Sequence, residues 1–174
     1  MKGERFLGNE YAIGRWIVDK LKYEKLAQHA KTNKVQVNQL EIWECDLGFN
    51  IGQEKDKKRP VVVLSKNTLN QGGKVLVAPI TGAMGKMSYT NPFHPRFLNW
   101  FLLHTSSPNP LHWYDPKRQI PKSATIYNCL TKDSMIHLEA MRSVSKARLT
   151  KKLPEVLSQN DWIKVQKILQ TRVF

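Results

Sequence analysis

The fold is decided by the stretch Pro60-Val61-Val62-Val63-Leu64, in which every side chain after the proline is apolar and three are β-branched. Because successive side chains of a strand point to opposite faces, this run predicts a strand that is buried on both sides. A further strand is expected from Lys74 to Thr81, where Pro79 limits the pairing. Turn-forming residues from 67 to 73 separate the two runs. The chain is therefore built around a β core.

Two helices are expected outside this core. Residues 10–31 carry apolar side chains at helical spacing, and a last helix begins at Ser158 or Asn160. The apolar stripe of the first helix consists of Ile13, Trp16, Ile17 and Leu21. We expect this stripe to pack on the chain's own strands or on another subunit, since a helix with one apolar stripe must cover something.

Other strands are expected over residues 35–45, 123–129 and 134–144. Residues 82–122 contain six prolines, so regular structure there should be short. The order of helix, strands and helix predicts an α+β domain whose strands form a small barrel. The expected domain organisation is an N-terminal helical extension over residues 1–34 and a barrel domain over residues 35–174, with an insertion at about 82–122.

The charge of the chain indicates the class of partner. Lys and Arg number 28 against 14 Asp and Glu among 174 residues, which gives a formal charge of +14. A surplus of this size favours a polyanion, since each phosphate that a cation neutralises releases condensed counterions. We therefore expect nucleic acid as the partner.

Composition excludes several classes of protein. The hydrophobic share of 41% is typical of a globular domain rather than a disordered chain. The apolar runs are too short to cross a bilayer, and no apolar region follows the first residues as in a secretory signal. Cys45 and Cys129 are too few for a disulfide framework or a zinc site. We expect a soluble, cytoplasmic domain with no membrane partner and no metal.

Candidate chemistry begins at the loop before the buried strand. Residues 52–60 contain Glu54 and four basic residues, among them Arg59, whose planar guanidinium suits a phosphate. Thr81 ends the following predicted strand, where its hydroxyl can donate to a phosphate oxygen. A solvated turn and a threonine placed for its β propensity explain the same residues, so the residue types alone leave both interpretations open.

A histidine and a carboxylate share one face of the strand predicted over residues 134–144. In that alternation His137, Glu139 and Met141 lie together, so the imidazole and the carboxylate can exchange protons. A plain salt bridge is the alternative. The other histidines show no metal-ligand spacing, which again predicts no structural metal.

The segment 82–122 holds seven of the 16 aromatic residues, interleaved with lysine and arginine. Bases of single-stranded RNA stack on aromatic faces, which makes this segment a candidate RNA platform. A small core that lets the insertion fold is the alternative, and the spacing does not distinguish the two.

Three motifs in order resemble MazF/PemK-type toxins. The first comprises Glu41-Ile42-Trp43, Asn50-Ile51-Gly52-Gln53-Glu54 and Lys58-Arg59-Pro60-Val61-Val62-Val63-Leu64-Ser65, where the family shows G-[ED]-[IV]-W, G-x-E-Q and R-P-[AV]-[LV]-[VI]. The second is Val75 to Thr81, against V-x-P-[IV]-T. The third is Ser134 to Val144, against S-x-[VI]-L-x-[DE]-Q-[IV]-R-[ST]-[IL]-D. The resemblance covers residues 40–81 and 124–174.

Some positions depart from the family pattern. Leu40 replaces the usual glycine, Ala140 replaces a glutamine, and Ser145 stands where aspartate is common. The predicted first helix and the segment 82–122 exceed the compact form of the family.

The resemblance implies a fold and an activity. The fold is a small SH3-like β-barrel with a C-terminal helix, in a homodimer. The activity is that of a toxin, a metal-independent and sequence-specific endoribonuclease without a cofactor, which a cognate antitoxin inhibits. The 2'-hydroxyl of single-stranded RNA attacks the adjacent phosphorus, leaving a cyclic phosphate and a 5'-hydroxyl.

The resemblance also assigns roles to matching residues. Arg59 would stabilise the phosphorane and is also a candidate for protonating the leaving group. Thr81 would bind the phosphate, Glu54 would be the acidic loop residue, and Glu139 would take the place of an acidic base. The expected RNA contacts are Gln53, Lys57, Lys58, His137 and Arg142.

Two other functions fit parts of the sequence. Gyrase poisons of the CcdB type are similar in fold but use a Trp-Gly-Ile triplet near the C-terminus, which the end of this chain, Ile168 to Phe174, does not contain. A non-catalytic nucleic-acid-binding barrel is the third hypothesis, and it would bind RNA without shortening it.

Overall fold

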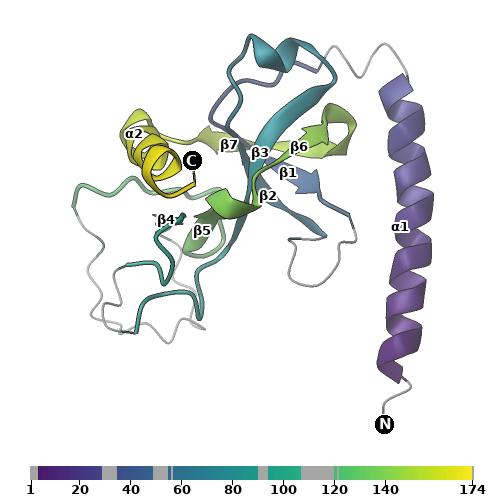
Figure 1. The fold of residues 1–174 in the computed structure, drawn as a ribbon, viewed down its shortest axis with the longest axis horizontal. Coiled ribbons are helices and arrows are strands. Elements are labelled where there is room, and N and C mark those ends of the chain that lie inside the picture. The colour runs from purple at the N-terminus through teal and green to yellow at the C-terminus, as the bar shows by residue number, and fades with distance from the viewer. Residues whose placement is uncertain are drawn as a thin grey trace.

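An antiparallel sheet forms the body of the protein, with one helix packed on it and a long helix at its side (Figure 1). The computed structural model describes residues 4–28, 35–48, 55, 57–89, 94–106, 120 and 122–173. The helices and strands are α1 (Glu4–Gln28), β1 (Glu41–Asp46), β2 (Lys58–Val63), β3 (Lys74–Gly82), β4 (Trp100–Leu103), β5 (Ser134–His137), β6 (Arg142–Ser145), β7 (Leu149–Val156) and α2 (Gln159–Ile168).

The strands lie in the order β4-β5-β3-β2-β1-β7, and β6 also pairs with β3. The long strand β3 joins two parts of the sheet, because its first half pairs with β6 and β2 while its end pairs with β5. Among the described residues β4 and β7 do not pair with each other, so the sheet stays open there. The predicted α+β class is confirmed, whereas a closed barrel is not seen.

The core lies on both faces of β2, as its sequence predicts. Val62 packs with Ile42, Ala78 and Ile136 in a cluster that α2 covers with Trp162 and Val165. Val61 and Val63 face a second cluster, in which the buried members include Trp43, Cys45, Leu47, Val75, Val77 and Val144. All three valines of β2 are fully buried. Burial on two faces requires the unbroken apolar run.

The last helix begins where the sequence predicts. Ser158 caps α2, since its hydroxyl accepts from the backbone N–H of Asp161 at 3.2 Å. The hydroxyl of buried Tyr127 donates to the Asp161 carboxylate at 2.7 Å. These bonds fix α2 against the segment around Tyr127.

The strand predicted over residues 134–144 is interrupted, which corrects the predicted alternation of faces. Strand β5 ends at His137, a 3₁₀ turn (η3) spans Leu138–Ala140, and β6 begins at Arg142. The interruption arises because β5 pairs with the end of β3 at Ile80–Gly82, whereas β6 pairs with its first half at Lys74–Val77.

Two strands were missed, one was wrongly predicted, and the strand expected over residues 35–45 begins only at Glu41. Residues 100–103 form β4 on β5, and residues 149–156 form β7 on β1. The predicted strand over 123–129 is reduced to a single bridge between His104 and Ile126. These edge elements depend on partners distant in sequence, which local patterns do not show.

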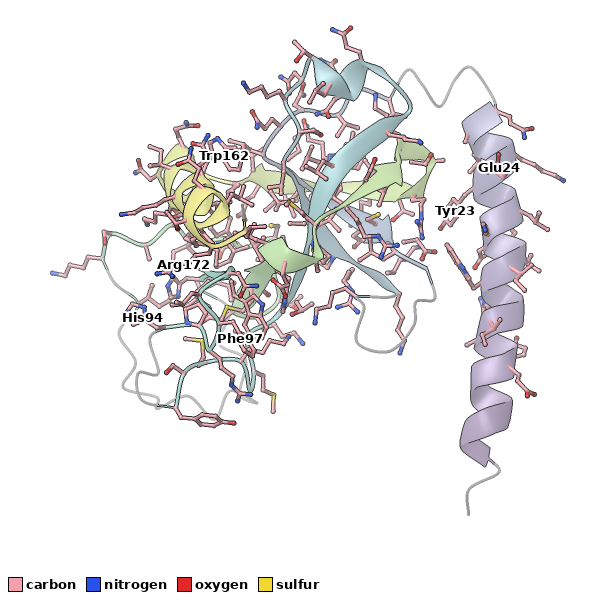
Figure 2. All side chains as sticks on the ribbon, viewed as in Figure 1. Tyr23, Glu24, His94, Phe97, Trp162 and Arg172 are labelled. Atoms are coloured by element: carbon pink, nitrogen blue, oxygen red, sulfur yellow. The ribbon has the colours of Figure 1, made fainter. Side chains whose placement is uncertain are left out.

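Helix α1 contacts the body by a different face from the predicted one. Tyr23 donates to the Asp46 carboxylate at 2.8 Å, and Arg148 lies over the Trp16 ring at 5.0 Å; Figure 2 labels Tyr23 on the side of α1 toward the sheet. Of the predicted stripe only Trp16 is in contact, and Ile17 is 53% exposed.

No helix in the described part of the chain is long and apolar enough to cross a membrane.

Two backbone positions explain local sequence. Leu40, which replaces the motif glycine, has φ of 71°, a conformation that costs a leucine about 1–2 kcal/mol. Gly48 has φ of 84°, and a Cβ there would overlap the Trp16 ring. Gly48 therefore permits both the turn after β1 and the docking of α1.

Candidate active site

Three strand ends meet at one edge of the sheet. Thr81 is the second-last residue of β3, and it pairs with Met135, the second residue of β5. On the other side of β3, Val61 of β2 pairs with Pro79. Arg59 and Thr81 each lie two residues beyond this pair, and the charge of Arg59 acts on Lys86, which donates to Thr81. The pairing thus places a guanidinium and a hydroxyl on neighbouring strands.

A chain of hydrogen bonds runs inward from Thr81. Its Oγ1 lies 2.8 Å from His137 Nε2, and His137 Nδ1 lies 3.0 Å from Glu139 Oε1. His137 has no exposed surface, and the partner of its Nε2 is the Thr81 hydroxyl. The turn at η3 brings the Glu139 carboxylate back to the imidazole although the strand has ended.

Two side chains at β4 hold the Glu139 carboxylate in place. Trp100 Nε1 donates to Oε1 at 2.8 Å, and Asn99 Nδ2 donates to Oε2 at 3.3 Å. The Trp100 ring also lies against the His137 ring, with 4.5 Å between centroids. Neither Asn99 nor Trp100 was predicted as a site residue, because their proximity depends on the pairing of β4 with β5.

The surroundings set the protonation states of the pair. Burial lowers the pKa of His137, and the charges of Lys55 and Lys86 lower it further, while Glu139 opposes them. Burial tends to raise the pKa of Glu139, but hydrogen bonds from His137 and Trp100 outweigh it and hold that pKa below 4.5. At neutral pH the imidazole is therefore neutral and the carboxylate is ionised.

Lys86 completes the chain from the solvent side. Its Nζ donates to Thr81 Oγ1 and, at 2.6 Å, to the carbonyl of Gly82. Burial lowers its pKa to about 8, and the charges of Lys55, Arg59 and Lys132 act in the same direction. The sequence offered only one weak signal for Lys86, its place among the cations of segment 82–122.

Cations surround the exposed end of this hydrogen-bonded chain. The side chain of Lys132 passes over Gly82 so closely that a Cβ there would meet its Cε at 2.7 Å. A cavity of about 200 Å³ opens beside Thr81, lined also by Pro60, Lys132 and Ser134. Partly desolvated cations at such a place attract an anion of the size of a phosphate.

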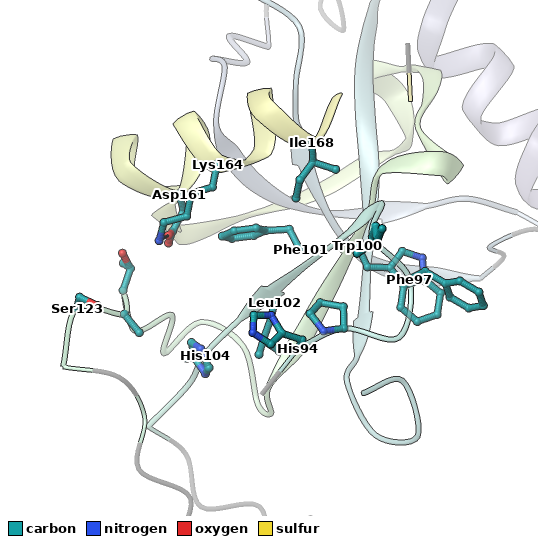
Figure 3. Close-up of a pocket in the computed structure, with 14 residues that line it drawn as sticks. His94, Phe97, Trp100, Phe101, Leu102, His104, Ser123, Asp161, Lys164 and Ile168 are labelled. Carbon is teal, nitrogen blue, oxygen red and sulfur yellow. Dashed lines mark hydrogen bonds and ion pairs between the residues drawn. The ribbon is translucent and has the colours of Figure 1, made fainter. Parts of the chain in front are cut away.

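A larger pocket adjoins the site through Trp100 (Figure 3). It measures about 490 Å³ and lies between β4, residues 123–125 and α2. Phe97 packs edge-on against Trp100 at 4.7 Å between centroids, and Phe101 points into the space below Ile168. Apolar and aromatic walls with a few polar groups such as Lys164 are typical of pockets for small ligands.

The remaining predicted residues are placed as follows. Lys58 is exposed at the start of β2, and Lys57, exposed just before it, has φ of 62°. Arg142 pairs with Val77, four residues along β3 from Thr81 and so about 13 Å away, and is not brought to the site. Gln53 and Glu54 lie outside the described residues.

The comparison with protein families agrees with the first two motifs. Residues 38–100 match the family described as PemK-like, MazF-like toxin of type II toxin-antitoxin systems, which confirms the resemblance over that stretch. No curated protein matches the chain.

Solved structures include three similar chains of low sequence identity. An endoribonuclease in complex with its cognate antitoxin, from a mycobacterial species, is 16% identical with a TM-score of 0.49, over 79% of this chain and 94% of that one. A mycobacterial endoribonuclease is 15% identical with a TM-score of 0.45, over 79% and 91%. The Mycobacterium tuberculosis toxin MazF-mt6 is 13% identical with a TM-score of 0.45, over 74% and 91%.

Proposed function

We propose that this chain, which carries a PemK-like, MazF-like toxin domain over residues 38–100, is a toxin that cleaves single-stranded RNA as an endoribonuclease. One observation carries the proposal: Arg59 and Thr81 stand on neighbouring strands beside a neutral imidazole and an ionised carboxylate, among further lysines. Cleavage of a phosphodiester bond uses such groups, because a base accepts the nucleophile's proton and cations stabilise the charge that develops on the phosphate.

The reaction proposed is attack by the RNA's own 2'-hydroxyl. The O2'–P bond forms, the P–O5' bond breaks, and a cyclic phosphate and a 5'-hydroxyl result. Arg59 stabilises the charge that develops on the phosphorane, since its guanidinium keeps its proton in any environment. Because the RNA supplies the nucleophile and Arg59 supplies a cation, we propose that the reaction needs no metal ion.

The RNA strand is proposed to cross the exposed edge of β2 and β3. Lys57 and Lys58 bind backbone phosphates beside the cleaved one, with Gln53 and Glu54 assigned there by the resemblance alone. Arg142 lies too far along β3 to touch the cleaved phosphate and would contact a flanking one. The pocket beside Trp100 would take a base, because bases stack on aromatic rings.

The test is direct. The purified protein is incubated with a long RNA in excess EDTA, and the cut ends are mapped. We expect short-sequence cuts with cyclic phosphate ends, and resistance of a substrate with a 2'-deoxy sugar at the cut. Arg59→Ala should lower kcat by roughly 10²–10³, as loss of a transition-state donor does. Binding without cleavage would favour the non-catalytic barrel, and inhibition of gyrase would favour the CcdB-like function.

The finer family properties belong to the same proposal. We propose a homodimer and a cognate antitoxin, in the cytoplasm where mRNA is found, and an SH3-like barrel in which β3 joins the two parts of the sheet. Light scattering of the purified protein measures the dimer. Co-expression with the product of a neighbouring gene, followed by the RNA assay, tests for an antitoxin.

A further inference from the structure

We propose that Thr81, His137 and Glu139 form a proton relay that acts as the general base for the 2'-hydroxyl, and that Lys86 is the general acid for the leaving group. This inference rests on the proposed ribonuclease function and adds to it the route of both protons. Lys86 was not among the predicted site residues, and the role of His137 changes from an RNA contact to the proton acceptor.

The polarity of the hydrogen bonds supports the relay. The Lys86 ammonium has only donors, so Thr81 Oγ1 accepts from it. The Thr81 hydroxyl then has its single hydrogen for His137 Nε2, at 2.8 Å, and one further lone pair for a ligand. His137 Nδ1–H donates to Glu139 at 3.0 Å. Every bond in the chain therefore points the same way, from Lys86 to Glu139.

Burial makes His137 a proton acceptor of the right kind. It has no exposed surface, the charges of Lys55 and Lys86 face it, and Glu139 is the partner that favours its charged form. The imidazole is thus neutral at rest, and Glu139 stabilises the imidazolium when it forms. Trp100 and Asn99 fix the Glu139 carboxylate, which in turn orients the ring.

Lys86 is suited to the opposite task. Its pKa of about 8 lies near neutrality because it is partly buried and faces Lys55, Arg59 and Lys132. An ammonium of that acidity is protonated at pH 7 but gives up its proton to a leaving alkoxide far more readily than an exposed lysine. Because the charges of Lys55, Arg59 and Lys132 act on the Lys86 ammonium, a phosphate bound among these cations would lie close to it.

The step balances in atoms and charge. The 2'-hydroxyl proton passes to Thr81 Oγ1 while the Thr81 proton passes to His137 Nε2, and O2' bonds to phosphorus. As the P–O5' bond breaks, O5' takes a proton from Lys86. The enzyme is left with an imidazolium and a neutral amine, joined through Thr81, so the same hydrogen bonds return the proton from His137 to Lys86 in the reverse direction.

This chain differs from the family motif at the central residue of the relay. The motif S-x-[VI]-L-x-[DE] has leucine at the position of His137. A buried strand position in the core suits leucine. A histidine there costs desolvation free energy, which its two hydrogen bonds offset.

The relay also implies that Thr81 accepts from the 2'-hydroxyl rather than donating to the phosphate.

The first experiment measures the pH dependence of kcat with a short cleavable RNA. In the wild type the rate should fall at acidic pH, below 6.5, as His137 becomes protonated, and at alkaline pH, above about 8, as Lys86 loses its proton. His137→Gln keeps an acceptor for Thr81 but cannot take a proton. It should lower kcat by roughly 10²–10⁴ and lose the acidic limb. Arg59→Ala should lower the whole profile and keep both limbs, with the alkaline limb moved to higher pH because the charge of Arg59 lowers the pKa of Lys86.

The second experiment uses an RNA whose leaving O5' is replaced by sulfur, because a thiolate leaves without protonation. Lys86→Met should be slow on the ordinary RNA and close to the wild-type rate on the sulfur substrate. His137→Gln should stay slow on both. Lys74→Met, at the other end of β3, is the matched control for loss of one positive charge and should behave as the wild type.

The outcomes separate the relay from the ribonuclease function. If the wild type cleaves RNA but His137→Gln, folded by its melting curve, keeps the rate and both limbs, the relay is wrong and the function stands. Should His137→Gln not fold, Glu139→Gln must shift the acidic limb to lower pH, and an unshifted limb overturns the relay. A wild type that does not cleave any RNA overturns both.

Discussion

Replacing Glu41 with glutamine is the most informative test of how the sheet is held. Glu41 opens the Glu41-Ile42-Trp43 motif, is 2% exposed and carries a carboxylate with four donors around it. Oε1 accepts from Asn38 Nδ2 at 2.9 Å and from Lys152 Nζ at 2.5 Å. Oε2 accepts from the Asn38 N–H at 3.1 Å and from Trp43 Nε1 at 2.9 Å. One carboxylate thus joins the turn before β1, the strand itself and β7.

The magnitude follows from the donors left without an acceptor. Glu41→Gln turns one acceptor oxygen into a donor. At the Oε1 position two of the four bonds are then lost, those from Lys152 Nζ and Asn38 Nδ2. Lys152 is half exposed and regains water, which makes its loss worth less than about 1 kcal/mol. The bond from Asn38 Nδ2 is made to the buried, charged carboxylate of Glu41, and its loss is worth about 1.5–3 kcal/mol. We expect a loss of about 1.5–4 kcal/mol, and a Tm lower by roughly 3–16 °C.

The assay is urea unfolding followed by tryptophan fluorescence at pH 7, with Glu44→Gln on the same strand as the control. Burial tends to raise the pKa of Glu41, but the bonds from Lys152, Asn38 and Trp43 outweigh it and place the folded pKa below 4.5. Stability that comes from the ionised form is present above 4.5 and is lost as the pH falls through the folded pKa. The difference between wild type and Glu41→Gln should therefore shrink in acid. A difference below 0.5 kcal/mol at pH 7, or one that is unchanged in acid, refutes the reasoning.

Three further outcomes are expected. Tyr127→Phe should destabilise the protein by about 1.5–3 kcal/mol in a thermal scan, because the bond to the buried Asp161 carboxylate is lost, while Tyr89→Phe, at an 84% exposed ring, should not. Trp16→Ala should raise amide exchange throughout α1, whereas Ile17→Ala should leave it unchanged, since Trp16 contacts the body and Ile17 is exposed; equal exchange in both would contradict this docking. Binding of single-stranded RNA should weaken with salt with a log–log slope of roughly −2 to −3, as for three or four phosphate contacts, and a slope near zero would argue against the cation cluster.

The local elements were largely predictable from sequence. The run Pro60 to Leu64 marks a strand buried on both faces because alternation has only two sides and both are apolar. Ser158 marks the start of α2 because its side chain caps the free N–H groups there. Such signals lie within a few residues of the element that they describe.

Edges and interruptions were not predictable in this way. The strand pattern over residues 134–144 is continuous, yet the chain breaks at Leu138 because two halves of β3 take different partners. The stripe of α1 contains several apolar residues, but docking is decided by Gly48, Asp46 and Arg148, which lie far along the chain. The pairing partner of residues 134–144 and the docking partners of α1 lie in other segments, so the pattern of each segment alone does not show them.

The same distinction between local and long-range information applies to the candidate site. By itself the sequence determined Arg59, Thr81 and Glu139 as candidates, since each lies in a short motif whose residue types suit phosphate chemistry. Only the tertiary structure decided that Thr81 meets His137, that Trp100 holds Glu139, and that Lys86 joins them. The physical reason is that a motif specifies which side chains a strand presents, whereas the register between strands distant in sequence determines which of those side chains lie within hydrogen-bonding distance.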